Sequence, residues 1–101
     1  MNNKITKEDF PKNIGLFEHG YFEEVPGKQI LSFGYYANED KLRLYVNYNM
    51  NTNVLTLYIM SSVKYPLGER IAYDTFKSLE ECILFINEWC FLNDHLFRPA
   101  G

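Results

Sequence analysis

Between residues 42 and 49 the chain reads LRLYVNYN, in which every second residue is aliphatic or aromatic. Successive side chains of a strand point to opposite faces, so this alternation predicts a strand with one face toward a core. The core side would carry Leu42, Leu44, Val46 and Tyr48. Similar apolar patterns, interrupted by turn residues, predict strands at residues 16–25, 29–37, 41–49, 54–63 and 70–76. A period of two residues places Leu55, Leu57, Ile59 and Val63 on one side of the fourth of these strands, and Ile71 and Tyr73 on one side of the fifth.

The segments between these predicted strands are short and rich in residues that favour turns. The clearest is VPGK at 25–28, where the proline presets one backbone dihedral and the glycine accepts a positive φ. Connections of this length join antiparallel neighbours much more readily than parallel ones. The strands are therefore expected to form a meander.

A helix is predicted to begin at SLEE, residues 78–81, which matches a capping box. The apolar pattern continues to about residue 96, shortly before Pro99. At about 100 degrees per residue, one broad half of this helix is apolar and should cover the sheet. That half contains Leu79, Cys82, Ile83, Phe85, Ile86, Trp89, Cys90, Leu92 and Leu96.

These elements predict an α+β fold, in which a long C-terminal helix packs on one face of an antiparallel β-meander of four to five strands. The segment TKEDF at 6–10 adds a short N-terminal helical turn, which Pro11 ends. A length of 101 residues and a hydrophobic content of 47% suit one compact domain, expected to span residues 1–101.

The charge of the chain bears on its partners, and its cysteines bear on its location. The formal net charge is −3 and the basic residues are scattered along the sequence, which disfavours direct binding of nucleic acid or of an anionic membrane. No apolar stretch approaches the roughly 20 residues of a membrane span, and the N-terminus does not resemble a signal peptide. Cys82 and Cys90 are expected to be free thiols on one helix, so a cytoplasmic location is expected.

The second face of the strand at 41–49 is a candidate contact surface. It carries Arg43, Tyr45 and Asn47, and Tyr58 on the following strand would lie close to Tyr45. One interpretation is a solvated face stabilised by cross-strand tyrosine pairs. Another is a protein-binding surface, because tyrosine, methionine and arginine are enriched at interface hot spots. An RNA-stacking platform is disfavoured, because no basic rim is evident.

The outer side of the predicted helix is the second candidate surface. Leu84 and Phe91 are seven residues apart and should share one side of the helix. Between residues 78 and 95 there are four carboxylates and no Lys or Arg, so a protein bound there would be basic. The carboxylates are those of Glu80, Glu81, Glu88 and Asp94.

Two alternatives remain open for the outer side of the helix. The N-terminal segment could cover the apolar pair through Phe10, Ile14 or Phe17. Isologous packing of two such helices could also bury the pair in a homodimer, although it would bring carboxylates together.

Few residues suggest catalysis or metal binding. His19, His95 and the two cysteines do not form a metal-ligand pair at short spacing, and no glycine-rich phosphate loop is present. Consecutive acidic pairs such as Glu23 and Glu24 do not converge on one substrate atom. We therefore expect no cofactor, no metal and no enzymatic activity.

The resulting hypothesis is a small acidic protein that inhibits a basic, nucleic-acid-handling protein by binding it. In size, charge and lack of catalytic motifs, the chain is similar to many phage or mobile-element inhibitors of bacterial defence, including anti-CRISPR proteins. The alternative is a homo-oligomeric structural or adaptor subunit, with a small enzyme or an RNA-binding domain less favoured. The predicted partner-binding residues are Glu80, Glu81, Leu84, Glu88, Phe91, Asp94, Arg43, Tyr45 and Tyr58.

Overall fold

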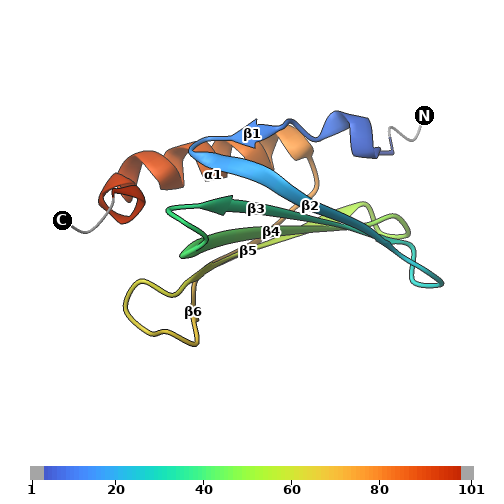
Figure 1. Cartoon of the computed structure of the whole chain (residues 1–101). Helices are drawn as coiled ribbons and strands as arrows, with labels where there is room; N and C mark the ends of the chain where they lie inside the picture. The colour runs from blue at the N-terminus through green and yellow to red at the C-terminus, as the bar shows by residue number, and fades with distance from the viewer. Residues whose placement is uncertain (1–3, 99–101) are drawn as a thin grey trace.

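The computed structural model describes residues 4–98, which form one curled antiparallel sheet with a helix against its inner face (Figure 1). The strand order in the sheet follows the order along the chain. The strands are β1 (Asn13–Ile14), β2 (Phe17–Val25), β3 (Ile30–Ala37), β4 (Leu42–Asn49), β5 (Val54–Ser61) and β6 (Glu69–Phe76). The helical elements are η1 (Lys7–Asp9), α1 (Leu79–Leu92) and η2 (Asp94–Phe97).

The predicted α+β class and antiparallel meander are confirmed, but the sheet has six strands instead of four or five. The additional strand is β1, which pairs with the start of β2 through Asn13 opposite Glu18 and Ile14 opposite Phe17. Two residues are too few to show an alternating pattern, so no sequence signal marked this strand. Gly15, at a φ of +60°, allows the tight reversal between β1 and β2.

The predicted N-terminal turn is present as η1. The carboxylate of Asp9 accepts hydrogen bonds from the backbone N–H of Thr6 at 2.7 Å and from its hydroxyl at 3.1 Å. Phe10 follows and stacks on Phe33 of β3 with ring centroids 3.5 Å apart. The turn therefore places the Phe10 ring in the core.

The inner face of the sheet is the core, and it follows the predicted alternation on β4 and β5. Leu44 pairs with Tyr35 on β3 and with Ile59 on β5, and all three side chains are fully buried. On β5 the run of alternating apolar residues ends earlier than predicted, because the last residue that faces the core is Ser61. Val63, predicted to continue the apolar side, lies beyond the strand and is exposed.

A bulge in β6 changes which residues face outward. Ile59 pairs with Ala72 and Met60 with Arg70, so Ile71 is the extra residue between them. Ile71 packs against the core, whereas Tyr73 lies opposite Tyr58 and is 54% exposed. The prediction that Ile71 and Tyr73 share one side was therefore wrong, because it assumed an unbroken two-residue period.

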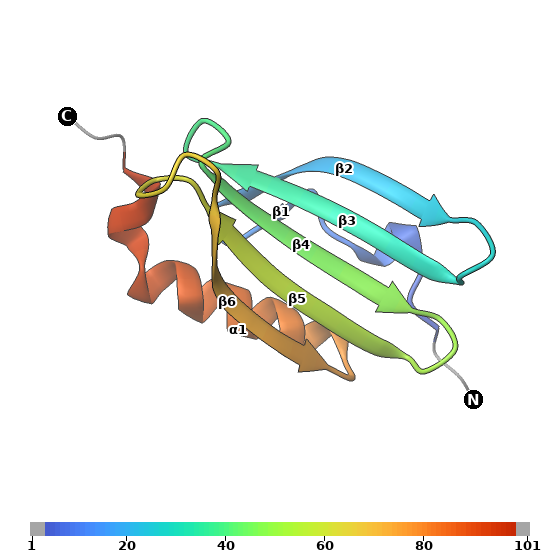
Figure 2. The same cartoon turned by 90° about the horizontal axis from the view of Figure 1, so that it is seen from below.

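Helix α1 lies in the curl of the sheet, between β1 and β6 (Figures 1 and 2). Its predicted N-cap is confirmed, since the Ser78 hydroxyl accepts a hydrogen bond from the Glu81 N–H at 3.0 Å. The side chains of Cys82, Ile86 and Cys90 are buried against the sheet.

The helix ends four residues earlier than the predicted residue 96, and η2 follows it. The side-chain amide of Asn93 donates to the Trp89 carbonyl at 2.9 Å and caps the helix there. Leu92, predicted on the covered half, is 73% exposed. Leu92 lies at the edge of the predicted apolar half, and the sheet covers only the middle of that half.

Within residues 4–98, neither α1 nor either short helical turn has the length and apolarity of a membrane span.

The close approach of the β1–β2 turn to α1 can be tested with two glycine variants. A Cβ atom at Gly15 would lie 2.8 Å from the Cys90 Sγ, so Gly15→Ala combines backbone strain with a clash. We expect a loss of about 2–3 kcal/mol in the free energy of unfolding, measured by urea denaturation. Gly27→Ala is the matched control, because Gly27 also has a positive φ but nothing lies within 4 Å. Equal losses in the two variants would show that the contact with α1 contributes nothing.

Candidate functional site

The outer face of the sheet carries a row of tyrosines across its strands. Tyr45 and Tyr58 lie directly opposite one another, as predicted, with ring centroids 5.0 Å apart and ring planes at 29°. Tyr73 on β6 extends the row beyond Tyr58. On the other side, Tyr45 pairs with Gly34, which pairs in turn with Tyr21 on β2. No element of residues 4–98 forms a second layer over this face (Figure 2).

Two glycines leave space for two more tyrosine rings, that of Tyr21 in this row and that of Tyr36 beside it. A Cβ atom at Gly34 would lie 2.9 Å from the Tyr21 ring, and one at Gly20 would lie 2.2 Å from the Tyr36 ring. The Tyr21 hydroxyl donates to the Glu23 carboxylate, which raises the pKa of Tyr21 and keeps it protonated. Sequence reasoning missed these two tyrosines, although isolated glycines within strand patterns were the available signal.

A groove is present where the outer face meets the loop of residues 62–68. It has a volume of about 330 Å³, and the loop descends on the side of the sheet away from α1 (Figure 1). Leu67 on the loop is fully exposed. The residues that line the groove include Lys41, Arg43, Tyr45, Tyr58, Met60 and Leu67.

Basic side chains gather around this groove, although they are scattered in the sequence. Arg43 lies opposite Met60, which pairs in turn with Arg70, and Lys41 lies on the lining. The Arg70 guanidinium lies 5.0 Å from the Tyr73 ring centroid, and Lys64 in the loop lies over Tyr65. None of these four cations has a carboxylate within 4 Å among the described residues. We call this region the basic groove.

The second surface is the exposed side of α1, which we call the acidic helix face. Its apolar centre consists of Leu84, Phe91 and Leu92, which are 58%, 82% and 73% exposed. The carboxylates of Glu80, Glu81, Glu88 and Asp94 surround this centre and are exposed. Lys77 directly precedes the N-cap of α1, and at the other end the Arg98 guanidinium is paired with the Asp94 carboxylate at 2.9 Å.

The alternative that the N-terminal segment covers Leu84 and Phe91 is wrong. Phe10, Ile14 and Phe17 are buried in the main core, where Phe17 meets Phe97 at a centroid distance of 5.2 Å. These three side chains fill the inner side of the sheet and leave the outer side of α1 uncovered.

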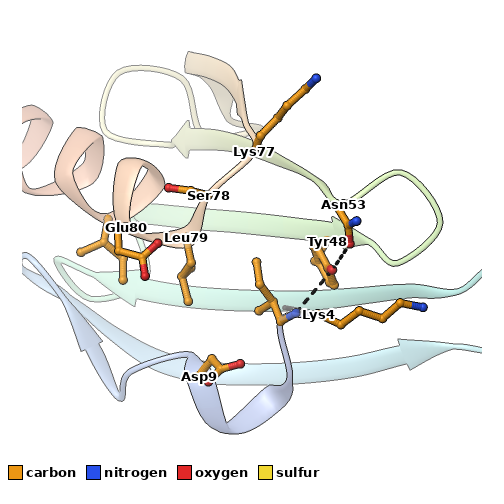
Figure 3. A pocket seen from close by; sticks show the side chains of 10 residues that line it. Lys4, Asp9, Tyr48, Asn53, Lys77, Ser78, Leu79 and Glu80 are labelled. Carbon is orange, nitrogen blue, oxygen red and sulfur yellow. Dashed lines mark hydrogen bonds between the residues drawn. The ribbon is translucent and has the colours of Figure 1, made fainter. Parts of the chain in front are cut away.

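A pocket of about 500 Å³ lies between the N-terminal segment and the start of α1 (Figure 3). Its lysines, Lys4 and Lys77, extend away from each other instead of converging on one point. At its base, the Tyr48 hydroxyl donates to the Asn53 side chain and accepts from the Ile5 N–H. The two lysines therefore do not form a convergent site for an anion.

The potential nucleophiles are held in the core. Burial raises the pKa of Cys82 to about 12 and also raises the pKa of Cys90, so both thiols stay protonated at neutral pH. The His19 ring lies edge-on to Tyr35, with centroids 5.3 Å apart. Within residues 4–98, no three His, Cys, Asp or Glu side chains are arranged to hold a metal ion.

The predicted contact residues thus lie on opposite layers of the molecule. Arg43, Tyr45 and Tyr58 are on the outer sheet face, and the six others are on or just after α1. Comparison of the chain with protein-family models, curated proteins and solved structures found no match in any of the three. Its function is therefore inferred from these two surfaces.

The burial of the thiols predicts slow chemical modification. At pH 8, both cysteines should react with Ellman's reagent far more slowly in the native protein than in urea, because only the thiolate attacks. Because burial raises both pKa values, each thiolate forms at a higher pH than it does on a free cysteine. Rapid release of two equivalents of product from the native protein would contradict the buried positions.

Substitutions on the exposed side and on the buried side of α1 should change the free energy of unfolding by different amounts. Phe91→Gln should change the free energy of unfolding by no more than about 0.5 kcal/mol, because the ring already contacts water. Ile86→Ala on the same helix should lower it by about 2–5 kcal/mol, because the side chain is fully buried. Denaturant titration measures both, and a large loss in Phe91→Gln would show that the ring packs within the monomer.

Proposed function

We propose that the protein is a non-enzymatic binding module that places its acidic helix face on a basic surface of another protein. The observation that carries this proposal is the exposure of Leu84 and Phe91, two turns apart on one side of α1, with Leu92 exposed next to Phe91. Exposed apolar side chains are common singly, but a contiguous group rimmed by charge is typical of interaction sites.

The apolar centre would provide affinity. Burying a side chain such as Phe91 contributes about 1.5–3 kcal/mol relative to leaving it in water. Leu84 lies four residues before Glu88, and Phe91 three residues after it, so all three share one side of α1. This arrangement suits binding of a helix in a groove, in which anchors at helical spacing enter an apolar cleft.

The carboxylates would select the partner. Helix α1 has no Lys or Arg, and Arg98 is already paired with Asp94, so this face keeps an excess of negative charge. Such a face attracts a basic protein and repels an acidic one. A surface with Lys and Arg around an apolar cleft has the matching chemistry.

Proteins that handle nucleic acids are a class with such surfaces, because they neutralise phosphates with Lys and Arg. An acidic protein seated on such a surface would compete with the nucleic acid. The finer proposal is therefore an inhibitor of a nucleic-acid-handling protein, of the phage or mobile-element anti-defence type that includes anti-CRISPR proteins. The small size, the net charge of −3 and the acidic helix face support it.

The test uses tagged protein to capture partners from lysate of the host cell, with two charge variants in parallel. Glu81→Lys with Glu88→Lys reverses the acidic helix face, whereas Glu8→Lys with Glu24→Lys makes the same change in net charge away from it. We expect wild type and the second variant to retain a basic protein that the first variant loses. The captured protein is then purified, and its binding is measured by calorimetry.

In the purified pair, the dissociation constant should rise at least about tenfold between 50 and 300 mM salt. Phe91→Gln should weaken binding by about tenfold or more through loss of the apolar contact. Added nucleic acid should compete with the protein for the same partner. Equal binding by both charge variants, or a partner with an acidic surface, would refute the proposal.

A further inference from the structure

The molecule carries two surfaces of opposite charge, and they face opposite directions. Figure 2 looks onto the outer face of the sheet, with α1 behind it. The basic groove lies on this outer face, and the acidic helix face lies on the opposite layer. A single molecule cannot bring these two surfaces together, but two molecules can.

The shape of the basic groove suits an aromatic side chain. Its floor contains the stacked pair of Tyr45 and Tyr58 together with Met60, and Leu67 forms part of its wall. Aromatic rings and thioether sulfur both make favourable contacts with a phenyl ring. Phe91, the most exposed aromatic ring of the described chain, lies on the acidic helix face.

The charges of the two surfaces are also complementary. Lys41 and Arg43 line the basic groove, and Arg70 lies two strands from Arg43 in the same row, with Met60 between them. Glu88 lies one helical turn before Phe91, so it would reach the rim of the groove when the ring enters. Some negative charge is present at this end of the sheet, since Glu39 and Asp40 are exposed in the β3–β4 turn.

We propose that the acidic helix face of one molecule docks in the basic groove of a second copy, with Phe91 in the groove and Glu88 beside Arg43. This contact joins two different surfaces, so each molecule can bind one neighbour on each side. The result is a head-to-tail ring or chain, not a two-fold dimer. Two-fold packing of α1 against its own copy would instead place carboxylates against carboxylates.

This inference concerns the purified protein alone and does not rest on the proposed function. A partner protein bound to the acidic helix face would displace the second copy, so head-to-tail assembly would compete with partner binding. Failure of one proposal therefore leaves the other standing.

The test uses sedimentation velocity over a concentration series at low salt. Wild type should show sedimentation coefficients that increase with concentration and decrease when salt is added. Phe91→Gln removes the ring that docks, and Arg43→Glu reverses the charge of the groove. Each variant alone should sediment as a monomer, since every contact needs one intact surface of each kind.

The decisive sample is an equimolar mixture of these two variants. Phe91→Gln keeps an intact groove and Arg43→Glu keeps an intact helix face, so the mixture should form a heterodimer and nothing larger. Lys28→Glu in the β2–β3 turn makes the same charge change away from the groove and should assemble like wild type. Circular dichroism checks that all three variants are folded.

Two results would overturn the proposal. Wild type that remains monomeric up to about 1 mM, the concentration at which a contact worth about 4 kcal/mol becomes visible, would exclude it. Self-association of Arg43→Glu alone, without heterodimer formation in the mixture, would show two-fold packing of helices instead.

Discussion

The structure depends on the packing of one helix into the inner side of a curled sheet. Cys82, Ile86 and Cys90 are the buried contacts of α1, and they meet a sheet face made of fully buried aliphatic and aromatic side chains. Apolar burial of this kind is the main favourable term in folding. Because residues 4–98 contain one α-helix, that helix covers one face of the sheet. The outer face and the outer side of the helix are left to solvent, and both candidate surfaces follow from this geometry.

The elements with a clear period could be predicted from sequence, and the exceptions have local physical causes. The alternation around Leu44 fixed which face of β4 is buried, and Ser78 marked the start of α1 correctly. Strand β1 was missed because two residues carry no period. Tyr73 was expected on the same side as Ile71, but the bulge at Ile71 shifts the alternation and places the two side chains on opposite sides. Leu92 was misplaced because the sequence shows which residues are apolar but not how widely the sheet covers them.

The sequence was enough to predict the acidic helix face but not the basic groove. The acidic helix face depends on local spacing, so Leu84, Phe91 and the carboxylates around them could be identified from a helical projection. The basic groove depends on register between strands that are distant in sequence. Arg43, Met60 and Arg70 form one row only because β4, β5 and β6 pair as they do. The sequence shows no basic rim because these residues are far apart along it, and the strand pairing brings them together.

The contact between Gly15 and α1 has a consequence for how the molecule folds. Every pair of adjacent strands is joined by a short connection, so the sheet can form through a series of local hairpins, which is fast. The contact of β1 with α1 is different, because it joins segments that are far apart in the sequence and closes a long loop. This contact connects the β1–β2 hairpin to α1. We therefore expect the sheet to unfold as one unit and not one hairpin at a time.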